Sequence, residues 1–277
     1  MDAPLKTNES FRTQAQKEHH KALSPLLKLT DLDPVLDVFL KSMHLFFLNV
    51  SKDLFEKLVD DRKILKLSTK QRQDLQESLQ SLSVGITMEF QRKKFDLSEQ
   101  KKWKATHYRF IILYIFPFLF RNYVTTNRYN HLLLLFVSVQ ILFSEEHAVK
   151  RVDYANTLLR KFFKLMPSFY DEDSQTVTFH NLIHVCHDVR HMKAPLSKYD
   201  AFPNGSFLGT LKKLIRTPNK PLSQVANRLK ELQSGPSMRI TKNVLLGTPI
   251  LENQFAASAN PSQSPSADEI LGIRFKN

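Results

Sequence analysis

The chain is poor in the residues that build disulfide frameworks and tight hairpins. Its 277 residues include one cysteine, Cys186, so no disulfide can form within the chain, and we expect a reducing compartment. Only 6 residues are glycine, against 21 phenylalanines, which disfavours a fold of strands and tight turns. The first residues, MDAPLKTNESFRTQ, lack the apolar core of a signal peptide.

Apolar runs long enough to cross a membrane are also missing. The two most apolar runs are 110–120 and 132–143, and each is shorter than the ~20 residues that a bilayer requires. Pro117 and Arg121 interrupt the first run. We therefore expect both runs to form buried helices, and we expect no membrane among the partners.

Positive charge, by contrast, is abundant. The chain holds 40 Lys+Arg against 27 Asp+Glu, which gives a formal net charge of +13. A surplus of this size favours a polyanionic partner, nucleic acid before an anionic membrane surface. Ordinary solubility is the alternative explanation.

Hydrophobic periodicity predicts a mainly α, multi-helix globular domain. From Pro34 to Leu58, apolar residues recur at spacings of three and four, which is typical of a helix with one buried face. Asp96 and Glu99 have the spacing of a capping box at the start of a helix. A loop is expected at 167–174. The same criteria predict further helices at 68–82, 96–117, 127–144, 147–166, 175–191 and 206–216, and one that begins at Pro221.

Composition divides the chain into three regions. Residues 1–33 form a polar N-terminal segment, and residues 34–233 form the helical domain. Residues 234–277 are rich in Ser, Pro, Ala and Asn, and we expect this tail to be disordered because it holds too few apolar residues to form a core.

Histidines recur on one face of the predicted helix at 175–191. His180, His184, Asp188 and His191 are three or four residues apart. Two imidazoles one turn apart can bind one metal ion, so His180 and His184 are candidate zinc ligands. A structural zinc site requires four ligands, however, and Cys186 lies on another face. A hydrogen-bonded polar stripe and a tuning of surface charge are the alternatives, and no other cofactor is expected.

A basic segment follows the histidines. Its apolar residues Leu208, Leu211, Leu214 and Ile215 are expected to face the core and its cations to point outward. Such a face suits phosphate contacts, which are salt-sensitive and largely independent of base sequence. An ordinary solvated helix face is the alternative, and the basic runs 91–94 and 101–104 favour DNA. The candidate nucleic-acid-binding residues are Lys212, Lys213, Arg216, Lys220, Arg228 and Lys230.

Several stretches together resemble one protein family, the CACTA-like cut-and-paste transposases. These are DDE enzymes related to the recombinase that rearranges immune-receptor genes, and the similarity is to their C-terminal half. It covers about residues 30–232. The matching stretches, in chain order, are LDPVLDVFLKSMHLFFLNVSKDL (32–54), EQKKWKATHYRFIILYIFP (99–117), YNHLLLLFVSVQILFS (129–144), HNLIHVCHDVRHMKAPLSKYDAFP (180–203) and FLGTLKKLIRTPNKPLSQVANRL (207–229).

The resemblance implies the C-terminal helical part of an RNase H-like fold, in which three carboxylates hold two metal ions at the scissile phosphodiester. This sequence departs from that pattern. Lys41, three residues before His44, stands where the family has an aspartate, and Gly205 stands where a glutamate is expected. His107 replaces a further acid, and the first catalytic aspartate would precede this chain. In relatives, the pair that matches His180 and His184 resembles half of a zinc site whose cysteines are missing here.

These features lead to three hypotheses. The first is a transposase-derived, catalytically inactive nuclear protein that binds DNA through the basic segment, with a homo-oligomer or a full-length transposase as a further partner. The second is an active metal-dependent transposase or nuclease that uses acids such as Asp37, Asp188 and Asp200. The third is a helical protein-interaction module, or a decayed reading frame, without nucleic-acid binding.

Overall fold

A computed structural model of the chain describes residues 5–19, 22–60, 67–86 and 94–234. These residues form helices and connecting turns and contain no strand, so the prediction of a mainly α, multi-helix fold is confirmed. The chain divides into two units, residues 1–202 and 203–277. The predicted helical domain spans that boundary. The predicted disordered tail, apart from Ser234 at the end of the last helix, lies outside the described residues.

Within the described ranges, no helix combines the length and the apolar character needed to cross a bilayer.

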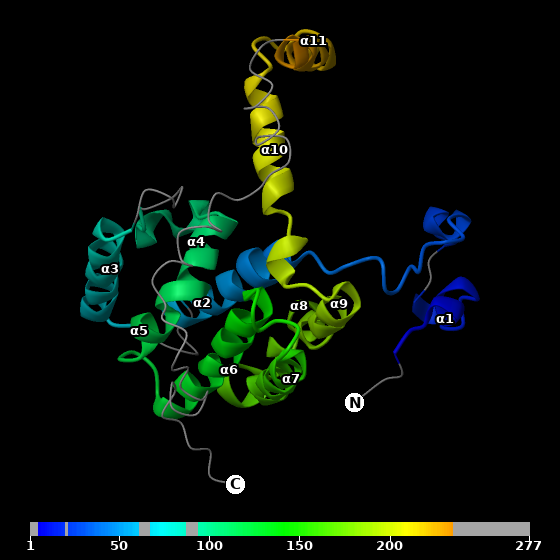
Figure 1. Cartoon of the computed structure of the whole chain (residues 1–277). Coiled ribbons are helices and arrows are strands. Elements are labelled where there is room, and N and C mark those ends of the chain that lie inside the picture. The colour runs from blue at the N-terminus through cyan, green and yellow to red at the C-terminus, as the bar shows by residue number, and fades with distance from the viewer. Residues whose placement is uncertain (1–4, 20–21, 61–66, 87–93, 235–277) are drawn as a thin grey trace, which may run out of the picture. The chain divides into compact units, whose positions relative to one another are not determined.

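The first unit is built on two helices that lie side by side, α6 (Thr126–Phe143) and α7 (Val152–Phe169) (Figure 1). Helix α6 buries four consecutive leucines, 132–135, because other elements cover it on several sides. Helix α7 is amphipathic and buries Ala155, Leu159, Phe162 and Met166 at spacings of three and four. The predicted helix at 127–144 is therefore confirmed, and the one at 147–166 begins five residues later.

Aromatic side chains join this pair to a layer of earlier helices. The layer consists of η3 (Met43–Val50, a π-helix), α2 (Ser51–Val59), α4 (Ala105–Phe110), η5 (Ile111–Ile115, also π-helical) and α5 (Phe116–Phe120). The ring of Phe47 lies 5.1 Å from that of Phe143, and the ring of Phe116 lies 6.4 Å from that of Phe136. Phenylalanine thus supplies much of the core.

The predicted helix from Pro34 begins only at Met43. Residues 34–41 form a turn instead, because the Asp33 carboxylate accepts hydrogen bonds from the backbone N–H groups of Val35 and Leu36, at 2.8 and 3.0 Å. Leu36 and Val38 are consequently exposed. The apolar spacing was correct for 43–59 and wrong for 34–41.

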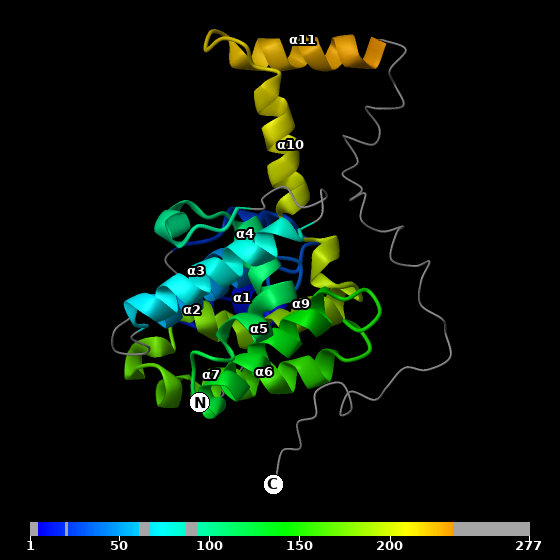
Figure 2. The same ribbon diagram turned by 90° about the vertical axis from the view of Figure 1, so that its left-hand side faces the viewer.

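Helix α3 (Thr69–Val84) confirms the prediction for 68–82, and Figure 2 brings this helix to the front. Ser68 and Gln71 form a capping box at its start, and Leu75 and Leu79 are its buried residues. The Gln76 side chain bonds the Phe95 carbonyl at 3.0 Å and the Leu97 N–H at 2.7 Å, so α3 is also fixed to the segment that precedes α4.

The predicted single helix from Asp96 to Pro117 is divided. Asp96 does cap a helix, but that helix is the short 3₁₀ segment η4 (Leu97–Lys102), and Glu99 pairs with Lys102 at 2.5 Å. Trp103 is extended because its ring is packed 5.2 Å from Phe55 and 5.6 Å from Phe95. The packing of Trp103 therefore divides the single helix that the sequence predicts into η4 and α4.

Pro167 lies inside α7, and Pro117 lies in the first turn of α5, directly after η5; neither has an N–H for the carbonyl four residues earlier. Pro117 has no N–H for Leu113, four residues earlier, and the Gln140 side-chain amide donates to that carbonyl instead. Pro167 likewise leaves the Phe163 carbonyl without a helical donor, and this carbonyl accepts from the Gln175 side chain at 2.7 Å. Helix α7 therefore continues to Phe169, and the loop predicted at 167–174 begins only at Tyr170 and contains the 3₁₀ turn η6 (Glu172–Ser174).

A buried histidine stands between α6 and α7. The Nε2 of His131 lies 2.8 Å from the Phe162 carbonyl, and its ring stacks on Phe162 at 4.4 Å and on Phe169 at 4.7 Å. Burial lowers the pKa of His131 to about 4, so the ring is neutral and Nε2–H donates. His131 therefore serves as an aromatic core residue whose Nε2 bonds a backbone carbonyl and whose Nδ1 lies 3.4 Å from the Tyr170 hydroxyl.

The hydrogen bond from Gln140 to the Leu113 carbonyl can be tested by mutation. We expect Gln140→Ala to lower the free energy of unfolding by about 1–2 kcal/mol, because it leaves the Leu113 carbonyl without a donor. In a Pro117→Ala background the restored N–H can donate to Leu113, and Gln140→Ala should then cost far less. Urea denaturation of the four proteins measures this coupling, and equal costs in both backgrounds would refute it.

His131 makes stability depend on pH. Its pKa is about 4 in the folded chain and near 6.5 when unfolded, so its contribution is complete above pH 6.5 and is lost as pH falls towards 4. The loss approaches about 3 kcal/mol. Unfolding measured from pH 7 to pH 4.5 should show a shallower decline for His131→Phe than for the unchanged chain. His147→Gln, which alters a half-exposed histidine, serves as the control.

Candidate nucleic-acid interface and histidine segment

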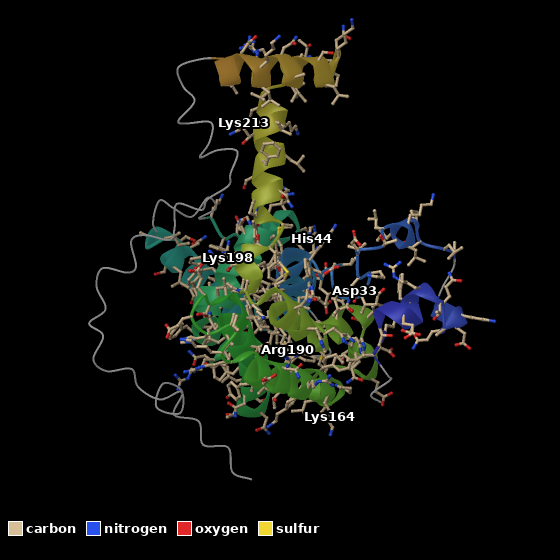
Figure 3. The ribbon with its side chains drawn as sticks, turned by 45° about the vertical axis from the view of Figure 1, so that its right-hand side comes forward. Asp33, His44, Lys164, Arg190, Lys198 and Lys213 are labelled. Carbon is tan, nitrogen blue, oxygen red and sulfur yellow. The ribbon has the colours of Figure 1, made fainter. Side chains whose placement is uncertain are left out.

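The predicted basic segment forms helices α10 (Phe202–Lys213) and α11 (Pro221–Ser234), and Figure 3 labels Lys213 on α10. Helix α10 begins before the predicted Ser206 because the Asp200 carboxylate accepts a hydrogen bond from the Phe202 N–H at 2.9 Å. Pro203 and Gly205 are then tolerated in the first turn. Pro221 is the first residue of α11, as predicted.

The side chain of Gln224 organises the turn between these helices. Its Oε1 accepts from the backbone N–H groups of Arg216 and Thr217, at 2.9 and 3.3 Å. Its Nε2 donates to the carbonyls of Thr217 and Asn219, at 2.9 and 2.5 Å. Nothing in the residue pattern singled out Gln224, because a glutamine four residues into a helix is ordinary.

The cations of this segment differ in what they contact. Lys212, Lys213, Arg216 and Lys220 are exposed, and none of them forms an ion pair with a described residue. Arg228, by contrast, pairs with Glu231 at 2.7 Å. Four of the six candidate residues therefore lie exposed around the turn. Arg228 is held by its ion pair with Glu231, and Lys230 is exposed on α11.

Residues 203–234 carry six Lys and Arg against one acid, Glu231. The field around the turn is therefore positive. Surface salt bridges contribute little to stability, so these cations are not explained by folding. An anion can approach them without displacing a carboxylate.

Of the apolar residues expected to face a core, Leu208 is exposed, and Leu211, Leu214 and Ile215 are only partly buried. Helix α10 has no buried residue, and Leu208 is 64% exposed. In α11, Leu222 is 84% exposed. The spacing predicts an amphipathic helix correctly, but it carries no information on what covers the apolar face.

The predicted histidine helix at 175–191 consists of three pieces. They are α8 (Val177–His180), the 3₁₀ turn η7 (Asn181–Ile183) and α9 (Val185–Met192). His180 and His184 nevertheless meet, with 3.0 Å between their Nε2 atoms. Burial, followed by the charges of His180 and His187, lowers the pKa of His184. One neutral ring can therefore donate to the other.

This pair can supply two nitrogen ligands to a metal ion, and further ligands are not at hand. No group of three or more His, Cys, Asp or Glu among the described residues is placed to hold one. Burial raises the pKa of Cys186 to about 12, so its thiol stays protonated in the core. Zinc at His180 and His184 stays a prediction.

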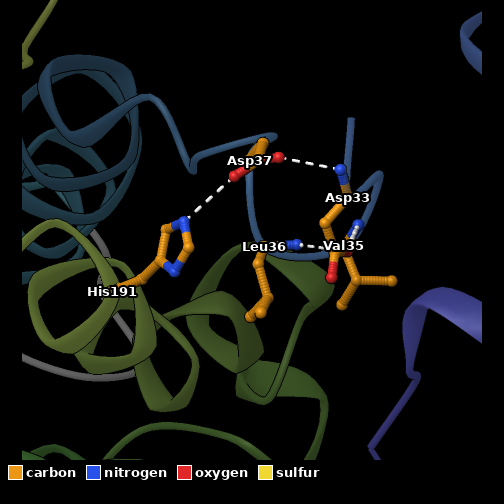
Figure 4. Close-up of polar contacts among 5 residues, drawn as sticks. All are labelled: Asp33, Val35, Leu36, Asp37 and His191. Atoms are coloured by element: carbon orange, nitrogen blue, oxygen red, sulfur yellow. Dashed lines mark hydrogen bonds and ion pairs between the residues drawn. The ribbon is translucent and has the colours of Figure 1, made fainter. Parts of the chain in front are cut away.

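The other two members of the histidine face connect α9 to an earlier segment. The Asp188 carboxylate accepts from the Leu40 N–H at 3.0 Å, and His191 lies 3.0 Å from Asp37 (Figure 4). The Phe39 ring packs against His191 and Tyr199, at 6.2 and 5.4 Å between ring centroids. Asp188 and His191 thus hold the turn at 33–41 in place.

The acids named for an active nuclease are engaged separately. Asp37 accepts from the Asp33 N–H at 2.7 Å, and this bond, with His191, lowers its pKa. Burial raises the pKa of Asp188 to about 6, and burial also raises the pKa of Asp200, which caps α10. Asp37 and Asp188 both bond backbone N–H groups of the turn at 33–41, whereas Asp200 bonds that of Phe202, and no group of three such residues in the described part of the chain is placed to hold a metal ion.

Two positions where the family would place acids also have local roles here. His107 is buried, its Nδ1 accepts from the Lys104 N–H at 3.0 Å, and its ring stacks on Trp103. Gly205 lies in the first turn of α10, where an added Cβ would meet no atom within 4 Å. A glutamate would fit there, so packing does not account for the glycine.

The chain matches no protein-family model, no curated protein and no solved structure. The similarity to CACTA-like transposases therefore rests on the five sequence stretches alone.

Asp188 gives the site a second pH dependence. Its folded pKa of about 6 lies above its ordinary 3.8, so the protonated form is favoured and its contribution is lost as pH rises through 6. Asp188→Asn stays neutral and keeps an acceptor for Leu40. We expect the variant to match the unchanged chain near pH 4 and to exceed its free energy of unfolding at pH 7 by on the order of 1 kcal/mol.

Denaturant unfolding at several pH values measures this difference. A variant that is less stable than the unchanged chain at pH 7 would mean that the attraction of His191 for the Asp188 carboxylate outweighs the cost of burying it.

Proposed function

We propose that the chain is a transposase-derived protein without catalytic activity that binds DNA through Lys212, Lys213, Arg216 and Lys220. The observation that carries this proposal is the gathering of four exposed cations, without ion pairs to described residues, around one ordered turn. The net charge of +13 supports it, as does the resemblance to DNA transposases. A nuclear location and a homo-oligomer or full-length transposase as further partner belong to the same proposal.

Binding of this kind uses phosphates rather than bases. The planar guanidinium of Arg216 can donate two parallel hydrogen bonds to phosphate oxygens, while the three lysines act as compact point charges. Each neutralised phosphate releases a condensed counterion, which makes the affinity fall steeply with salt. We therefore propose low sequence specificity.

The proposed lack of catalysis has its own support. The positions that the family resemblance assigns to metal-binding acids hold Lys41, His107 and Gly205, and an ammonium group repels a divalent cation. Asp37, Asp188 and Asp200 cap or fix backbone segments. Metal-dependent cleavage of duplex DNA that Asp188→Ala abolishes would establish the alternative, an active nuclease.

The DNA-binding proposal predicts a strong effect of charge reversal. Lys212→Glu, Lys213→Glu and Arg216→Glu together should weaken binding of a fluorescent duplex by at least about a hundredfold at ~50 mM salt, because three phosphate contacts become repulsive. Fluorescence anisotropy at several salt concentrations should also show the slope of log K against log[salt] reduced by about 3.

A matched triple variant separates this local effect from net charge. Lys150→Glu, Arg151→Glu and Lys164→Glu remove the same charge from exposed positions of the first unit. This control should retain most of the affinity. Equal losses in both variants would indicate attraction by overall charge, and no binding by the unchanged chain would favour a protein-interaction module.

A further inference from the structure

The amide of Gln224 uses its full hydrogen-bonding capacity inside the turn at 214–220. Its oxygen has two lone pairs and accepts two backbone N–H groups, those of Arg216 and Thr217. Its nitrogen has two hydrogens and meets three acceptors, the carbonyls of Thr217 and Asn219 and the Thr217 hydroxyl at 3.0 Å, so one hydrogen is shared. Gln224 therefore has no donor or acceptor left for a ligand.

The turn needs this support because its own backbone is poorly suited to order. Pro218 contributes no N–H, and Lys220 adopts a left-handed conformation with φ of 46°. The backbone of the turn also makes few hydrogen bonds within itself, because the N–H groups of Leu214 and Ile215 donate to carbonyls of α10. The Gln224 amide thus fixes the backbone from Arg216 to Asn219, between two of the proposed phosphate-binding cations.

We infer that Gln224 is a positioning residue of the proposed DNA interface, which it serves by holding Arg216 and Lys220 at a fixed spacing without touching the ligand. The inference rests on the proposed function. Duplex phosphates occupy fixed positions, and cations on a turn that is already ordered bind them without a further loss of conformational freedom. The ligand class is accordingly the phosphodiester backbone of duplex DNA.

Gln224→Met tests this role, because methionine has the length and helix propensity of glutamine and lacks its amide. The full-length chain is titrated against a fluorescent 20-base-pair duplex of mixed sequence. We expect the affinity to fall about tenfold, because ordering the turn now opposes binding. Hydrogen exchange of the Arg216 and Thr217 amides, measured without DNA, should be faster in the variant.

A double-mutant cycle separates positioning from general damage. In an Arg216→Ala, Lys220→Ala background, the cations that Gln224 positions are gone, and Gln224→Met should change the affinity less than about twofold. Gln73→Ala removes an exposed glutamine of α3 together with its hydrogen bond to Glu77, and it should leave DNA binding unchanged. Far-UV circular dichroism checks that α11 stays helical.

Three outcomes would overturn the inference. Equal losses of affinity in both backgrounds would assign Gln224 to general folding of the segment. Faster exchange in the variant with unchanged affinity would mean that binding does not need an ordered turn, although the DNA-binding function would stand. Absence of duplex binding by the unchanged chain would remove the proposed function, and the inference with it.

Discussion

The first unit depends on one constraint: a backbone carbonyl that faces a proline in place of a helical N–H needs another hydrogen-bond donor. Pro117 and Pro167 have no N–H for the carbonyls of Leu113 and Phe163. The side-chain amides of Gln140 and Gln175 donate to these carbonyls instead. Because of these two amides, the helices on either side of α6 continue past a proline. Phe116, Leu119 and Phe120 stay packed, and Phe169 stays stacked on His131.

Several histidines of the first unit are structural residues. His131 and His107 fill aromatic positions while each makes one backbone hydrogen bond, and His191 holds Asp37. His180 and His184, by contrast, pair with each other. Arginine is also used structurally in the first unit, where Arg72 meets Asp60 and Arg190 meets Asp153 at 2.6 Å. Lys212, Lys213, Arg216 and Lys220 form no such pair with a described residue, and this supports the proposal of a polyanionic partner.

The candidate site was only partly predictable. The run of Lys and Arg between 212 and 230 is visible in the sequence, and four of its members do gather at one turn. The engagement of Arg228 by Glu231 depends on a side-chain conformation, and the role of Gln224 depends on how the backbone from 216 to 219 folds back. Residue order alone indicates neither, because each arises from geometry that many sequences share.

The sequence by itself determined the helical class and the elements with complete local signals. Ser68 with Gln71 begins α3, the apolar run 127–144 forms α6, and Pro221 begins α11, because capping and periodicity act over only a few residues. Tertiary structure decided the rest. The Asp33 turn, the break at Trp103 and the passage of α7 through Pro167 each depend on a partner distant in the chain or on a side chain competing with the helix, and such partners meet only when the core forms.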